Sequence, residues 1–291
     1  MEVLKEFRDA MPILSDGNQL RERMTQDGYL FFRRLLPEDE VLAVRRDIIR
    51  LCQDKGWVDE TERASSHPRW EGSDDYWEVY DALQCLESFH ALAHRPELKD
   101  IVYHLVQEEV FVHPRNIARI TFPNVDQSTT PPHQDYVHIQ GTTETYTAWI
   151  PLGFCPVELG GLAVLAGSHR YGLLSVHPAV GPGNLAVRVD NLEGDWLTTD
   201  YEPGDVLIFH SLTVHRALPN RSQDQLRLSV DYRYQGLSQP ICDGALQPHY
   251  GRLTWDQIYK GWQRQELMYY WEGLPLHLVP YDPSCVRLEQ V

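Results

Sequence analysis

The sequence predicts a mostly β protein with flanking helices and a jelly-roll or barrel core. Between residues 109 and 235, short runs rich in β-branched and aromatic residues are separated by Pro, Gly, Asn and Asp. Such runs are typical of short strands, and many short strands at these intervals indicate a jelly-roll or barrel. On both sides of this region the apolar residues recur at helical spacing instead.

The 291 residues are expected to form one domain with three parts. A helical support spans residues 1–108, the strand-rich core follows over about 109–235, and a helical extension occupies 236–291. One hydrophobic core is the default because this length is ordinary for a large β-barrel enzyme.

The N-terminal part begins with two predicted helices, over residues 18–24 and 38–52, separated by a strand within DGYLFFRRLLP (27–37). Pro37, followed by three acidic residues, indicates a helix start, since proline pre-sets the backbone and acids complement the helix dipole. Residues 54–75 lack periodicity and are expected to form a mobile loop.

Further helices are predicted over residues 77–94 and 97–107, and again over 254–271 near the C-terminus. A Pro-rich strip, LPLHLVPYDPS (274–284), follows the last of these and is expected to pack over the core. The strands of the core are predicted within VFVHPRNIARITF (110–122), TETYTAWIPL (143–152), GGLAVLAG (160–167), GDVLIFH (204–210), TVHRALP (213–219) and QLRLSVDYRYQ (225–235).

The formal net charge of the chain is −16. An acidic surface repels phosphate backbones and anionic lipid, so nucleic acid is not an expected partner. No segment approaches the roughly 18–20 consecutive apolar residues of a membrane span. The five cysteines are scattered and lack CxxC spacing, which predicts reduced thiols in a cytoplasmic protein.

A candidate metal site lies in PPHQDYVH, where His133 and Asp135 are two residues apart. On a strand, residues at this spacing point to the same face and can contact one ion. An HxD pair alone is common by chance, so a third ligand decides the case. His215, about eighty residues later at the start of a predicted strand, is the expected ligand, and His210 is the alternative.

Two histidines and one carboxylate on one side of iron(II) leave three positions for a bidentate keto acid and O2. Arg227 follows His215 by twelve residues. Its guanidinium offers a fixed fork of donors that suits the distal carboxylate of 2-oxoglutarate. The spacing from Arg227 to His210 is less suitable.

With these motifs the chain resembles the phytanoyl-CoA dioxygenase (PhyH) family of iron(II)- and 2-oxoglutarate-dependent oxygenases. The resemblance spans about residues 18–235 and rests on DGYLFFRRLLP, HQD at 133–135, AWIPL, GGLAVLAGSHR, GDVLIFH and the His215-to-Arg227 spacing. It implies a double-stranded β-helix (jelly-roll, cupin-like) core. It also implies a set of site residues: His133, Asp135 and His215 for iron, Arg227 for 2-oxoglutarate, and Gln134 and Trp149 in the lining.

One position departs from the family pattern. Many relatives carry Ser two residues after the distal histidine, where it helps to bind the keto acid, and here that residue is Ala217. Another donor is then required, and Thr147 and Asn116 are the candidates. Halogenation is not expected, because family members that halogenate carry a small residue where this chain has Asp135.

The resemblance implies oxidation, chiefly hydroxylation, of a small-molecule substrate with release of succinate and CO2. The alternatives are a non-oxidative cupin-like metalloenzyme, such as an isomerase or hydrolase, and a catalytically silent ligand-binding barrel. The acidic surface disfavours a polyanionic acyl-CoA and favours a small metabolite. The substrate and the oligomeric state are not predicted by these motifs.

Several other residues have less specific interpretations. His138 is expected to support or line the pocket, and His169 to bond backbone groups in a turn. The aromatic run at 269–271 is expected to pack as core. Three arginines are interpreted as surface charges, the first of them also as a candidate contact for a substrate carboxylate: Arg119, Arg216 and Arg233.

Overall fold

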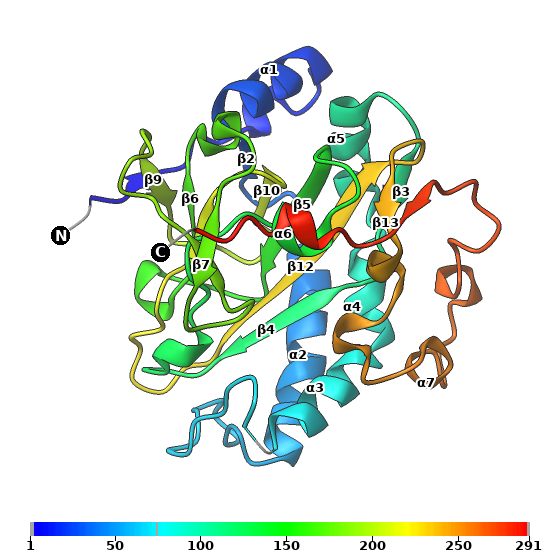
Figure 1. The fold of residues 1–291 in the computed structure, drawn as a ribbon. Coiled ribbons are helices and arrows are strands. Elements are labelled where there is room, and N and C mark those ends of the chain that lie inside the picture. The colour runs from blue at the N-terminus through cyan, green and yellow to red at the C-terminus, as the bar shows by residue number, and fades with distance from the viewer. Residues whose placement is uncertain (1–2, 74, 290–291) are drawn as a thin grey trace.

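The computed structural model describes residues 3–73 and 75–289, and two β-sheets form its centre (Figure 1). The larger sheet has the strand order β2 (Tyr29–Phe32), β10 (Val206–His210), β5 (Thr145–Pro151), β12 (Arg227–Gly236) and β3 (Val110–Val112), and β4 (Ile117–Thr121) also pairs with β12. The smaller sheet has the order β1 (Lys5–Glu6), β9 (Trp196–Thr198), β6 (Leu162–Leu165) and β11 (His215–Ala217). Two short pairs complete the strands: β7 (Val176–Pro178) with β8 (Leu185–Val187), and β13 (Ile241–Cys242) with β14 (Leu278–Val279).

The two sheets pack face to face through a cluster of buried side chains. Trp149 and Phe209 of the larger sheet contribute to it, together with Leu162 and Val164 of the smaller one. This arrangement is the predicted double-stranded β-helix, in which inward-facing residues of both sheets fill or line the interior.

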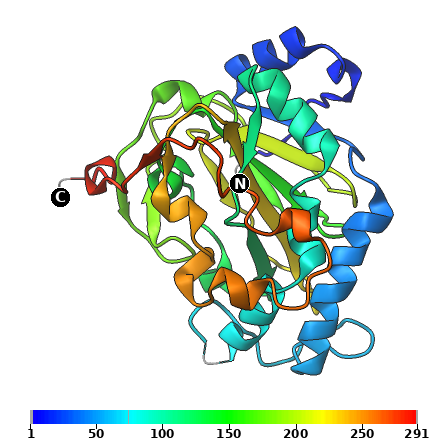
Figure 2. The same cartoon turned by 90° about the vertical axis from the view of Figure 1, so that its right-hand side faces the viewer.

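Five helices cover the outer face of the larger sheet (Figure 2). They are α1 (Gly17–Asp27), α2 (Glu38–Asp54), α3 (Tyr76–Gln84), α4 (Glu87–Leu92) and α5 (Pro96–Val106). Helix α2 begins after Pro37 with three acidic residues in its first turn, as the sequence predicts. The N-terminal part is not purely a helical support, because it also supplies β1 and β2 to the two sheets.

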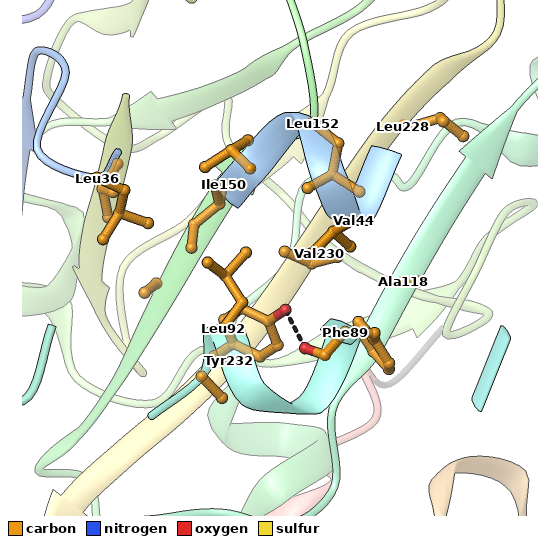
Figure 3. Packing of buried hydrophobic residues seen from close by; sticks show 14 of the residues in the cluster. Leu36, Val44, Phe89, Leu92, Ala118, Ile150, Leu152, Leu228, Val230 and Tyr232 are labelled. Carbon is orange, nitrogen blue, oxygen red and sulfur yellow. Dashed lines mark hydrogen bonds between the residues drawn. The ribbon is translucent and has the colours of Figure 1, made fainter. Parts of the chain in front are cut away.

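Strand β12 separates the helical layer from the interior by the alternation of its side chains. Leu228, Val230 and Tyr232 belong to the core shared with the helices, and the Tyr232 hydroxyl donates to the Phe89 carbonyl oxygen of α4 at 2.6 Å (Figure 3). The intervening residues, which include Arg227 and Arg233, face the cavities between the sheets. A strand buried on both faces can therefore carry polar groups on one of them.

Helix α1 ends at Asp27, and Gly28 follows it as the C-cap residue. Gly28 has φ of 76°, and a Cβ atom there would lie 2.4 Å from Nδ1 of His169. The Gly28 carbonyl oxygen accepts from the Thr213 hydroxyl at 2.7 Å. Only glycine meets both conditions, a left-handed backbone and this close approach.

Two helix predictions are wrong in part. The helix predicted over 77–94 is broken between α3 and α4. The helix predicted over 254–271 is wrong beyond its first turn, α7 (Trp255–Ile258). Gly261 and Tyr269 have φ of 89° and 49°, so the chain turns where a helix would continue.

The C-terminal segment is held instead by aromatic packing, which agrees with the expected core role of residues 269–271. Trp262 and Trp271 are buried beside Phe111, and the Tyr270 hydroxyl donates to the Val112 carbonyl oxygen at 2.9 Å. The predicted loop over 54–75 begins one residue early, since Asp54 is the last residue of α2. The described part of residues 55–75 contains neither helix nor strand, and its mobility stays a prediction. Within the described ranges, no helix has the length and apolar character that crossing a membrane requires.

Candidate active site

His133 and His215 lie directly opposite each other across a short antiparallel bridge. The backbone N–H of each residue donates to the carbonyl oxygen of the other at 3.0 Å, and the centroids of the two imidazole rings lie 4.1 Å apart. His215 opens β11, so the smaller sheet fixes one imidazole and the bridge fixes the second one against it.

Asp135 reaches the histidines through a turn, so the prediction that His133 and Asp135 share one face of a strand is wrong. Asp135 has helical dihedral angles and precedes the short helix α6 (Tyr136–Ile139). Its Oδ1 atom lies 3.6 Å from Nε2 of His133 and 3.7 Å from Nε2 of His215. All three side chains are buried, and one ligand atom from each lies within 4.8 Å of the others.

Hydrogen bonds fix the metal-binding form of both imidazoles. Nδ1 of His133 lies 2.8 Å from the Pro131 carbonyl oxygen, and Nδ1 of His215 lies 3.0 Å from that of Thr213. A carbonyl only accepts, so each Nδ1 carries the proton and each Nε2 offers a lone pair. Burial, with a smaller contribution from His133, lowers the pKa of His215 to about 3, which keeps this ring neutral. Two imidazole nitrogens and one carboxylate oxygen fit iron(II).

The second carboxylate oxygen of Asp135 is held by two neighbours. Oδ2 accepts from the Thr147 hydroxyl at 2.6 Å and from Nη2 of Arg233 at 3.2 Å. Burial alone raises the pKa of the Asp135 carboxyl, but Arg233 and the two histidines more than offset it, so the pKa lies well below its ordinary value. The carboxylate is therefore ionised, with Oδ1 directed toward the histidines.

Arg233 is a site residue that the sequence interpretation assigned wrongly to the surface. Its side chain is buried on the inner face of β12. The alternation in QLRLSVDYRYQ could have identified it, since Arg227 and Arg233 are an even number of residues apart and so share a face. Arg119 is also not a free surface charge, because its Nε lies 3.2 Å from Oδ2 of Asp231. The Arg216 guanidinium stacks 4.0 Å over the Trp196 ring.

A narrow cavity beside the triad contains the expected co-substrate residue, Arg227. Nη1 of Arg227 donates to the Ser229 hydroxyl at 2.7 Å, and its buried Nε has no hydrogen-bond partner within the described part of the chain. A buried donor without a partner is costly, and a bound carboxylate would satisfy it. Trp149 and Ala217 line the same cavity, as does Thr147, whose hydroxyl is engaged by Asp135.

Two expected pocket residues are not brought to this cavity. The Gln134 side-chain amide donates to the carbonyl oxygens of Gly172 and Leu212, so it joins two loops. Asn116 faces the helical layer, where its Nδ2 donates to Nδ1 of His90 at 3.0 Å. Arg115 and Ile117 on either side of Asn116 do face a cavity, so strand alternation directs Asn116 away from it.

The other histidines have separate roles. His210 lies 3.4 Å from a carboxylate oxygen of Glu144 and is not part of the triad cluster, which favours His215 as the distal ligand. Nε2 of His169 bonds the Thr25 carbonyl oxygen at 3.0 Å, so His169 bonds backbone as expected, but in α1 and not in its own turn. His138 lines a second, wider cavity of about 540 Å³ next to the metal ligands.

Comparisons with known proteins identify the family. The family model of phytanoyl-CoA dioxygenase (PhyH) matches residues 24–229. A 1-deoxypentalenic acid 11-beta-hydroxylase of Streptomyces exfoliatus is 27% identical over 263 residues, which cover 85% of this chain and 91% of that protein.

Two solved structures share the fold. The epimerase SnoN in complex with Fe3+, alpha ketoglutarate and nogalamycin RO is 23% identical with a TM-score of 0.57, over 77% of this chain and 85% of that one. EvdO2 from Micromonospora carbonacea var. aurantiaca, complexed with 2-oxoglutarate, is 19% identical with a TM-score of 0.53, over 81% and 94% of the two chains. With the match over 24–229 covering most of its length, the chain belongs to the phytanoyl-CoA dioxygenase (PhyH) family and is an iron- and 2-oxoglutarate-dependent oxygenase, as its sequence predicted.

Proposed function

We propose that the protein hydroxylates a small organic molecule at an iron(II) ion held by His133, Asp135 and His215, with Arg227 binding 2-oxoglutarate. The observation that carries the proposal is the convergence of these three buried ligand atoms within 4.8 Å, beside a cavity that contains a buried guanidinium. Hydroxylation is supported by the Streptomyces relative, which is named as an 11-beta-hydroxylase.

The bound iron and co-substrate would supply the oxidising power: one substrate C–H bond, O2 and 2-oxoglutarate give the C–OH product, succinate and CO2. The protein's own contribution is to position the reactants. Pro131 and Thr213 hold the two imidazoles through their Nδ1 protons, and Arg233 and Thr147 hold the carboxylate through Oδ2.

Arg227 would orient the co-substrate. Its side chain lies on the inner face of β12 with one donor on Ser229 and Nε available. Two N–H donors in a fixed plane match one carboxylate, so they would fix the far end of the keto acid and direct its other end toward the triad. The apolar walls formed by Trp149, Leu162 and Phe209 would exclude water from that complex.

Thr130 is our candidate for the donor that replaces the missing Ser hydroxyl at position 217. The Thr130 carbonyl oxygen accepts from the Ala217 backbone N–H at 3.1 Å, so the two residues are adjacent. Both line the narrow cavity. The nearby hydroxyl of Thr147 is less suitable because it already donates to Asp135.

We further propose that residues 1–291 act as one domain in the cytoplasm. The shared core of helices and strands supports one domain. The five free thiols support a reducing compartment.

The test of the proposed metal centre is spectroscopic. Protein loaded anaerobically with iron(II) and 2-oxoglutarate should show a weak visible metal-to-ligand charge-transfer band. His133→Ala, Asp135→Ala and His215→Ala should each abolish the band, whereas the matched control His210→Ala should retain it. Arg227→Met should weaken 2-oxoglutarate binding at least ~10-fold, the loss expected for one charge-assisted pair. An unchanged band in His215→Ala, or its loss in His210→Ala, would refute the ligand assignment.

A further inference from the structure

The wide cavity next to the triad shares wall residues with two neighbouring cavities. Toward the narrow cavity its wall includes His133, Asp135 and Arg119, which both cavities share. A third cavity of about 280 Å³ adjoins the wide one through a wall that includes Arg115 and Arg233. A molecule that fills the wide cavity can therefore contact both the metal ligands and Arg115.

Three guanidinium groups face the wide cavity, and two of them are neutralised by protein carboxylates. Arg233 pairs with Asp135, and Arg119 pairs with Asp231, both at 3.2 Å. Arg115 instead donates from Nε to the Gln247 carbonyl oxygen at 3.0 Å, which is an uncharged acceptor. Throughout residues 3–73 and 75–289, no carboxylate lies within ion-pair distance of Arg115.

The rest of the surroundings leaves this positive charge without compensation. Burial lowers the pKa of His113 to about 3. Burial, and to a smaller extent the nearby arginines, hold the pKa of His249 well below its ordinary value. Both rings are therefore neutral. Among the described residues, the one carboxylate that lines the wide cavity besides Asp135 is that of Glu71, and it interacts with Tyr250 and Arg119 and not with Arg115. A partly buried cation without a counter-ion is costly in a chain of net charge −16. A ligand anion would offset that cost.

We propose that Arg115 binds a carboxylate group of the substrate, so that the enzyme acts on a small organic acid. This inference rests on the proposed function and adds the substrate class. The acid group would lie where the wide and third cavities meet, and the reacting carbon would lie beside His133 and Asp135. One uncompensated guanidinium matches one carboxylate, whereas a phosphate dianion would call for more positive charge.

Two arginines of one segment are candidates for the anchor. Arg115, Ile117 and Arg119 alternate along the segment that leads into β4, and all three face the wide cavity. Arg119 is less suited to be the anchor because Asp231 already pairs with it.

The test compares a rigid acid with its neutral isostere. The probes are 1-adamantanecarboxylate and 1-adamantanecarboxamide, titrated calorimetrically into protein loaded anaerobically with iron(II) and saturating 2-oxoglutarate, so that the co-substrate already occupies Arg227. The acid should bind at least ~10-fold more tightly than the amide, as expected for a charge-assisted contact. Arg115→Met should remove this preference while changing the affinity of the amide less than ~2-fold, and Arg115→Lys should retain part of it.

The matched control is Arg50→Met, which removes an exposed arginine of α2 paired with Asp47 and should leave the preference unchanged. Equal affinities of acid and amide in the wild type would overturn the proposal. So would a preference that survives Arg115→Met, or displacement of the acid by inorganic phosphate at lower concentration than by acetate. Absence of the charge-transfer band in the wild type would refute the metal centre instead, and the same titration of metal-free protein would then test the anchor.

Discussion

Nη2 of Arg233 lies 3.2 Å from Oδ2 of Asp135, and both side chains are buried. The contact joins the inner face of β12 to the turn that carries the candidate carboxylate ligand. Because the Thr147 hydroxyl binds the same oxygen, Oδ2 is saturated and Oδ1 remains for a metal. Partners of this kind fix the orientation of a ligand and commonly matter as much as the ligand's identity.

Removal of the Arg233 charge should weaken iron binding. Arg233→Met leaves the Asp135 carboxylate buried, without the two hydrogen bonds that Arg233 donates to Oδ2 and with no cation beside it, so the iron(II) affinity should fall ~10–100-fold. Anaerobic iron titration measures this without turnover, which matters because Arg233 also lines the wide cavity. Arg233→Lys, which keeps the charge, should recover part of the affinity. Equal iron affinity in the wild type and Arg233→Met would show that the ion pair serves packing alone.

The Thr147 hydroxyl should have a smaller effect of the same kind. Thr147→Val keeps the shape of the side chain but removes the 2.6 Å hydrogen bond to Asp135, so iron affinity should fall roughly 10-fold, the cost of one bond to a charged group. Thr147→Ser restores the hydroxyl and should restore the affinity. If Thr147→Val instead weakens 2-oxoglutarate binding and leaves iron binding intact, the hydroxyl serves the co-substrate, as the sequence alone suggested.

The six core segments predicted as strands are confirmed because their side-chain pattern is local, but the sequence analysis missed the short strands β7, β8 and β9. In β12 the alternation of Arg227, Ser229 and Asp231 with apolar residues is visible in the letters, and it places the polar set on the inner face. The same alternation applied to Asn116 would have excluded it from the pocket, since its neighbours on both sides face the cavity.

What the sequence could not give is geometry that depends on tertiary contacts. The turn at Asp135 is fixed partly by the Tyr136 backbone N–H, which donates to the Ser211 carbonyl oxygen at 3.0 Å, 75 residues further along the chain. The C-terminal segment has helical periodicity, yet its aromatic residues pack around Trp262 and Trp271 in a non-helical path. In both places long-range packing overrides the local preference.

Gly28 should be intolerant of a side chain. Gly28→Ala places a Cβ atom 2.4 Å from Nδ1 of His169 at a φ of 76°, so it combines a steric clash with left-handed strain. The strain alone costs about 1–2 kcal/mol. The matched control is Gly56→Ala, whose φ is 66° but whose Cβ would meet nothing within 4 Å. Urea unfolding should show a clearly larger loss for Gly28→Ala than for Gly56→Ala. Similar losses would mean that His169 moves aside at little cost.

The stability of the protein should fall on mild acidification because several histidines are buried in the neutral form. Burial lowers the pKa of His90 and His94 to about 4 and that of His113 to about 3. For His90 the hydrogen bonds agree, since Nδ1 accepts from Asn116 and Nε2 donates to the Gln84 carbonyl oxygen, an arrangement that a protonated ring would break.

The direction of this pH dependence follows from the difference in proton binding between the folded and the unfolded chain. With folded pKa values below the ordinary value of 6.5, the unfolded chain binds more protons between about pH 4 and 6.5, so the stability present above pH 6.5 is lost as the pH falls through that window. Each proton taken up on unfolding contributes about 1.4 kcal/mol per pH unit to the slope. Urea unfolding between pH 5 and 7 should therefore show a shallower slope for His90→Gln than for the wild type. His67→Gln, at an exposed position, is the control and should leave the slope unchanged. An identical slope in His90→Gln and the wild type would mean that His90 is protonated to the same extent in the folded and unfolded states.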